Sequence, residues 1–128
     1  MKQIFTIISL FFSLQGIAQN WLQLNDSLIK YFNKEEFGTA AIFGEKGLLQ
    51  SKEEYGLHHP NYLIALENLR NSYNRNNELA KASTLAVLVL NYYKQTADTF
   101  SVEYAAALNQ LAILQEKTKQ FILAEENY

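Results

Sequence analysis

The sequence predicts an all-α protein, an α-solenoid of antiparallel helix pairs that follows a short N-terminal leader. Three observations lead to this prediction: similar residues recur every 42 positions, apolar residues within each period follow helical spacing, and no long stretch alternates apolar and polar residues as a strand would. A single helix pair cannot bury its own apolar face, so stacked pairs explain the repetition. We expect about two and a half repeats.

Residues 1–18 are expected to be a signal peptide. Lys2 precedes an apolar run from Ile4 to Leu14, and Gly16 and Ala18 suit the small-residue subsites of signal peptidase. The run is short for a bilayer span, so we expect no membrane span in the mature chain. Cleavage near Ala18 would leave an exported protein, periplasmic or extracellular. A buried N-terminal helix or an uncleaved anchor is the alternative.

The period of 42 residues sets the expected repeat boundaries. Residues that coincide at this offset include Ala40, Ala82 and Ala124; Phe37, Leu79 and Phe121; Tyr62 and Tyr104; Leu66 and Leu108; Leu69 and Leu111. We therefore expect repeat 1 over about 20–58, repeat 2 over about 59–100 and an incomplete repeat 3 over 101–128. The recurring residues Leu66, Leu69, Ala82, Leu108, Leu111 and Ala124 are expected to face neighbouring helices.

Each period contains two amphipathic stretches joined by a short polar turn, which makes the two helices antiparallel neighbours. Tyr62, Ala65, Leu66 and Leu69 follow the i, i+3, i+4, i+7 rule, and Pro60 suits the first turn of a helix. The predicted helices, each uncertain by about three residues at its ends, are 21–33, 36–54, 60–75, 78–95, 101–117 and 120–128.

Composition excludes several functional classes. With 11 Lys+Arg against 13 Asp+Glu and a net charge of −2, no basic surface for nucleic acid is expected. The absence of Cys excludes disulfides, thiolate zinc sites and cysteine nucleophiles. His58 and His59 are adjacent on a predicted loop, not at the i, i+4 spacing of helical metal ligands. We expect no metal, no cofactor and no catalysis within this chain.

The segment from Gly56 to Leu69 carries a family resemblance. It reads Gly-Leu-His-His-Pro-Asn-Tyr-Leu-Ile-Ala-Leu-Glu-Asn-Leu and follows the pattern G-x-x-H-P-x-Y-x-x-x-L-x-N-L. Residues 21–128 thus resemble the tetratricopeptide repeat (TPR) family, in the 42-residue kinesin-light-chain-like form found in bacterial exported proteins. Arg70 departs from the pattern, since the family usually has a small residue there, and Ala112 restores it one period later.

The resemblance implies a concave groove, lined by the first helix of each pair, that binds a protein or peptide partner. Alignment with the family implies these groove residues: Leu22, Asn25, Ile29, Phe32, Asn33, Ile64, Glu67, Asn71, Asn74, Arg75, Ala106, Asn109, Ile113, Glu116 and Lys117. Asn side chains both donate and accept, so they could bind an extended peptide backbone. The alternative is that Asn is simply a common exposed residue.

The helix that begins near Phe121 is short, and its apolar residues lack a cover. We therefore expect the chain to be the N-terminal piece of a longer protein with a downstream domain; a natural short protein that pairs with another chain is the alternative. The predicted function is an exported interaction scaffold. A second class is a regulatory or sensor region of a larger enzyme, because similar exported arrays precede CHAT caspase-like peptidases and membrane histidine kinases.

Overall fold

Residues 19–96 and 99–127 are described by the computed structural model, and within these two ranges the chain forms helices and turns but no strand. The helices are α2 (Trp21–Asn33), α3 (Phe37–Tyr55), α4 (Pro60–Arg75), α5 (Leu79–Gln95) and α6 (Val102–Glu126). The bounds of α2 to α5 agree with the predicted ones to within one residue. The all-α prediction is confirmed for the described ranges.

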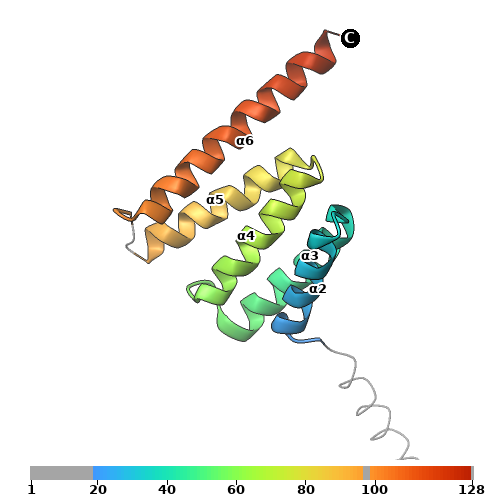
Figure 1. Cartoon of the computed structure of the whole chain (residues 1–128). Helices are drawn as coiled ribbons and strands as arrows, with labels where there is room; N and C mark the ends of the chain where they lie inside the picture. The colour runs from blue at the N-terminus through green and yellow to red at the C-terminus, as the bar shows by residue number, and fades with distance from the viewer. Residues whose placement is uncertain (1–18, 97–98, 128) are drawn as a thin grey trace, which may run out of the picture.

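The helices pack in the order of the chain. Each helix lies against the next, and α2 also touches α4. Figure 1 shows α2 to α6 as a staggered row in which consecutive helices run in opposite directions. We call α2, α4 and α6 the first helices of the pairs, and α3 and α5 the second helices. Such neighbour-to-neighbour packing is consistent with a helical repeat.

Each first helix begins with a side-chain cap. Asn20 Oδ1 accepts from the Gln23 amide at 2.9 Å, and the Gln23 side chain accepts from the Asn20 amide at 3.2 Å. Before α4, His59 Nδ1 accepts from the Asn61 amide at 3.0 Å. The hydroxyl of Ser101 caps α6. His59, one of the two histidines considered as metal ligands, is therefore a helix cap.

The turn between the first and second helix repeats in atomic detail. Glu35 and Asn77 lie one 42-residue period apart, and both have φ of 60°. In each turn the next amide donates to a tyrosine carbonyl, that of Tyr31 or Tyr73, at 2.9 Å. A positive φ is uncommon for residues other than glycine, so its recurrence at this interval is a structural counterpart of the sequence repeat.

The core lies between α3, α4, α5 and the first half of α6. Gly44 lets α3 approach both first helices that flank it, because a Cβ at this position would lie 2.8 Å from Cδ1 of Leu28 and 2.8 Å from Cδ1 of Leu69. Ser51 and Ser72 are fully buried, and their hydroxyls donate to backbone carbonyls of their own helices. Small residues therefore bring the helices close at the centre of the array.

The turn predicted between 117 and 120 is wrong, because α6 is one continuous helix through this segment. Lys119 occupies the repeat position of Glu35 and Asn77, yet it is helical, and Thr118 bonds to the Leu114 carbonyl within the helix. Every residue from 119 to 127 is exposed, so this segment gains no packing that could offset the cost of a turn. Figure 1 shows the end of α6 projecting past the α4–α5 turn.

The predicted core residues divide accordingly. Leu66, Leu69 and Ala82 are buried, and Leu111 is half-buried. Leu108 and Ala124 are exposed, so the prediction was wrong for these two. For Leu108, the reason is that α4 has a helix packed on each side, α3 and α5, whereas α6 packs against α5 alone among the described helices. Ala124 is exposed because it lies in the projecting end of α6.

The expected signal peptide, residues 1–18, lies outside the described ranges. Tyr128, the last residue of the predicted helix 120–128, lies outside them too. Among the helices that are described, none combines the length and the hydrophobicity needed to cross a bilayer.

Candidate functional site

Two hollows flank α4, each in the gap between successive first helices. The α2–α4 hollow has a volume of about 150 Å³ and is lined by Leu28, Ile29, Phe32, Asn33, Asn68 and Asn71. The α4–α6 hollow has a volume of about 220 Å³ and is lined by Glu67, Arg70, Ala86, Val89, Tyr93, Glu103, Ala106, Ala107 and Gln110. Because α4 separates the two, a ligand lying across this helix could reach both.

Apolar side chains are exposed at matching positions of the first helices. The residues are Leu22 and Ile29 on α2, Ile64 on α4 and Ile113 on α6, with exposed fractions of 40–56%. Leu22 and Ile64 share one repeat position, and Ile29 and Ile113 share another, seven residues further along the helix. A spacing of seven residues places both positions on the same helix face. The first helices therefore present one shared, partly apolar surface.

An amide pair connects the first two of these helices. The side-chain nitrogen of Asn68 donates to Oδ1 of Asn25 at 2.8 Å. Asn71 lies one turn further along α4 and is exposed at the edge of the α2–α4 hollow. This hollow therefore offers amide groups that can both donate to and accept from a peptide backbone.

Arg75 lies in a cluster with two aromatic rings. Its guanidinium carbon is 4.6 Å from the ring centroid of Phe37 and 6.0 Å from that of Phe32. The two rings meet edge to face with centroids 5.1 Å apart. Arg75 thus holds α4 to α2 and to the start of α3, while its place in a partner-binding groove stays a prediction.

The α4–α6 hollow contains opposite charges that do not pair. Among the described residues, neither Glu67 nor Arg70 has a side-chain hydrogen bond or an ion pair, although they lie one turn apart on α4. Burial raises the pKa of Glu67 above its ordinary 4.5, an effect that the Arg70 charge opposes. Burial also lowers the pKa of Arg70, against the effects of Glu67 and Tyr93. Both charged forms are therefore poorly solvated.

Arg70 also carries a buried donor without an acceptor, its Nε. A buried donor in this state costs about 1–3 kcal/mol. The same repeat position holds Leu28 in the first pair, where Leu28 is buried against Gly44. Arg70 is thus the residue at this position that fits its surroundings least well, and such departures from good packing are typical of functional positions.

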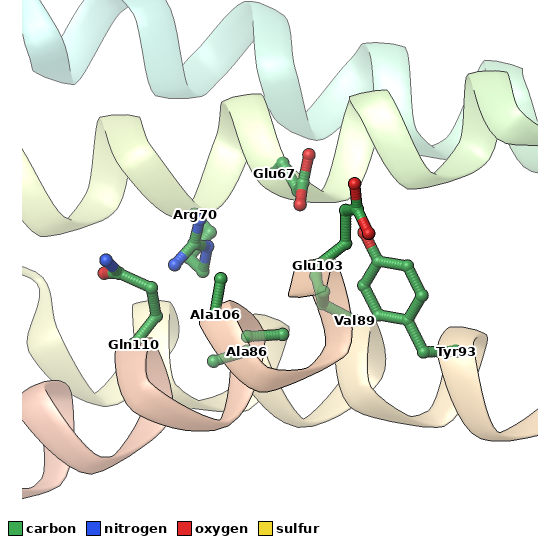
Figure 2. Close-up of a pocket in the computed structure, with 9 residues that line it drawn as sticks. Glu67, Arg70, Ala86, Val89, Tyr93, Glu103, Ala106 and Gln110 are labelled. Carbon is green, nitrogen blue, oxygen red and sulfur yellow. The ribbon is translucent and has the colours of Figure 1, made fainter. Parts of the chain in front are cut away.

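Figure 2 shows how the charges are distributed in the α4–α6 hollow. Glu103 lies at one end, near the Tyr93 ring, Arg70 and Gln110 lie toward the other end, and Glu67 lies between Arg70 and Glu103. Three alanines, Ala86, Ala106 and Ala107, form much of the wall between them. The short alanine side chains leave the space open.

The predicted groove residues do not all line the hollows. Those that do are Ile29, Phe32, Asn33, Glu67, Asn71 and Ala106. Asn109, Glu116 and Lys117 are exposed on α6, and Asn74 is half-buried near the end of α4. Lining residues absent from the prediction include Asn68, Arg70, Glu103 and Gln110. Asn68 and Gln110 share a repeat position, and a search for recurring amides could have found them.

A third hollow follows from the continuous α6. It has a volume of about 450 Å³ and is lined by residues 77–81 and by Thr118, Phe121, Ile122 and Glu125. It lies between the start of α5 and the end of α6.

Comparison with known proteins adds no assignment. No family model matches this chain, and no curated protein matches it either.

Proposed function

We propose that this chain is an exported scaffold of the TPR type that binds an extended peptide or a segment of a partner protein along its first helices. The observation that supports this best is the exposure of Leu22, Ile29, Ile64 and Ile113 at matching repeat positions on one surface. Exposed apolar side chains that recur on one face are typical of protein interaction surfaces.

The polar groups of this surface suit a peptide backbone. Asn71 at one hollow and Gln110 at the other each offer a donor and an acceptor, on opposite sides of α4. A peptide crossing α4 would meet apolar side chains for its own side chains and amides for its backbone. Recognition of this kind needs no catalytic group in the scaffold.

Export is part of the proposal. The basic residue, apolar run and small residues of positions 1–18 support a cleaved leader and a partner outside the cytoplasm. Amino-terminal sequencing of the protein recovered from the cell envelope or the medium tests this: a start at Gln19 supports export, and an intact Met1 in the cytosol contradicts it.

We also propose a longer array with a downstream domain. The support is the uncovered face of α6, where Leu108 is exposed at a position that is buried on α4. One more helix packed on this face would give α6 the surroundings of α4. Such an array could serve either as a scaffold or as the regulatory region of a larger enzyme. Sequencing the gene beyond the codon for Tyr128 tests this: further repeats alone would support a scaffold, and a peptidase or kinase domain would support a regulatory region.

Binding is tested with a panel of random peptides displayed on phage and selected against the chain. The affinity of a selected peptide is then measured for Ile64→Ala and Asn71→Ala, each with a matched control on a second helix. Leu49→Ala is the apolar control and Asn91→Ala the amide control, because both residues are exposed. We expect at least about a tenfold loss for the groove variants and none for the controls. The reverse pattern would place binding on the second helices.

A further inference from the structure

We propose that the α4–α6 hollow binds a basic side chain, lysine or arginine, of the peptide that occupies the groove. This inference rests on the proposed function and names the chemistry of one position of the ligand. It is carried by the shape of the hollow, by the balance of its charges, and by the lack of a hydrogen bond or ion pair to the side chains of Glu67 and Arg70 within the described residues.

The shape suits one long, unbranched side chain. The hollow has a volume of about 220 Å³ and is bounded by three helices, with Ala86, Ala106 and Ala107 in its wall. The stem of a lysine or arginine side chain would lie along these methyl groups and along Val89, while its charged end reaches a carboxylate.

The charge balance favours a cation. Among the described residues of the lining, Glu67 and Glu103 contribute two carboxylates and Arg70 one guanidinium, so these residues carry one net negative charge. An acidic ligand would add to this charge, whereas a single ammonium or guanidinium group would neutralise it. Glu103 lies at the end of the hollow away from Arg70, and Glu67 lies between the two, so a cation beside Glu103 can reach both carboxylates from the side away from Arg70 (Figure 2).

The state of Glu67 adds a reason. Its carboxylate is half-buried and lacks a hydrogen bond or ion pair within the described residues, and burial raises its pKa. A cation from the ligand would stabilise the charged form that the protein alone leaves poorly solvated. Within the described lining, the other charged groups are Arg70 on the same helix and Glu103 on α6.

Arg70 complements this arrangement at the other end. Its guanidinium is beside Gln110, and its terminal nitrogens are suited to donate to a backbone carbonyl of the same peptide. The peptide would then be fixed by its side chain at the acidic end and by its backbone at Arg70. This gives the hollow a preference for both residue type and direction.

The experiment is a double-mutant cycle on peptides selected by display. We expect selection to enrich Lys or Arg at one position, and replacement of that residue by Gln to weaken binding about tenfold. In the Glu67→Gln/Glu103→Gln protein the same replacement should cost less than about twofold. Glu53→Gln, an exposed acid on α3, is the matched control and should keep the full effect.

Each result decides a different point. Enrichment of acidic residues, enrichment without charge preference, or an undiminished cost in the double variant would overturn this inference and leave the proposed function standing. Failure to select any peptide would overturn the proposed function itself. Because Glu103 is exposed, Glu103→Gln alone provides a folded variant if the double variant unfolds.

Discussion

Leu66 and Leu108 occupy the same position of the repeat, yet Leu66 has an exposed fraction of 0% and Leu108 one of 46%. The residue type and the helix register are identical, so the difference comes from what covers each side chain. Among the described helices, α4 is packed between α3 and α5, whereas α6 packs against α5 alone. Burial in this array is therefore set by neighbouring helices and only indirectly by the repeat position.

This relationship predicts unequal costs for one substitution. Leu66→Ala should lower the free energy of unfolding by about 2–5 kcal/mol, because it leaves a cavity in the core. Leu108→Ala should lower it by no more than about 0.5 kcal/mol. Urea unfolding followed by circular dichroism measures both. Equal losses would show that α6 is covered in solution.

Two glycines of α3 should respond oppositely to alanine. Gly44→Ala places a Cβ 2.8 Å from two leucine side chains and should cost about 1–3 kcal/mol. At Gly38 the nearest atom is 3.5 Å away, in the side chain of Asn76, so Gly38→Ala should be neutral or stabilise by up to about 1 kcal/mol through helix propensity. Thermal melts of the two variants provide the comparison. A stable Gly44→Ala protein would contradict the close approach of α3 to α2 and α4.

The two arginines of α4 should also respond oppositely when replaced by methionine. Arg70→Met removes a buried donor that lacks an acceptor and keeps most of the side-chain packing, so it should raise stability by about 1 kcal/mol. Arg75→Met removes the contact with the Phe37 ring and should lower stability by about 0.5–1 kcal/mol. Chemical unfolding measures both values. A drop for Arg70→Met as large as that for Arg75→Met would mean that Arg70 stabilises the fold.

The pH dependence of stability should report the burial of Glu67. Its pKa is raised in the folded state, so the folded chain binds more protons than the unfolded one as pH rises through and above 4.5. The contribution of Glu67 to stability therefore falls over this window. The stability that Glu67→Gln gains over wild type should therefore be larger at pH 7 than at pH 4. The two gains should differ by less than about 1 kcal/mol, because the site is partly solvated. The exposed Glu53→Gln serves as reference, and a difference that shrinks as pH rises would be the contrary result.

Sequence reasoning located the helices well because their signals are local. Pro60 and the polar turns at 33–36 and 74–78 mark boundaries within a few residues of themselves. The turn near Lys119 was wrong because a repeat position gives a turn only when the segment after it can pack. Alignment with the family predicted Arg75 only as a groove residue. Its stacking on Phe37 depends on how the first turn of α3 packs against α4, which the repeat pattern does not give.

The lining of the hollows was harder to predict. Arg70 was noticed as a departure from the family pattern, but the fact that it lines one hollow with Glu103 and Gln110 depends on how α5 places α4 and α6. Glu67 was predicted from its register, whereas its burial follows from the neighbouring helices. The repeat pattern gives the direction of a side chain, and packing decides which side chains meet.

The most direct test of the groove is a map of chemical-shift changes in the amide spectrum of the chain as a display-selected peptide is added. Binding along the first helices predicts the largest changes at Ile29, Ile64, Asn71 and Gln110, with little change on the second helices. Changes centred on Leu49 and Asn91, with the first helices unaffected, would contradict the proposed groove.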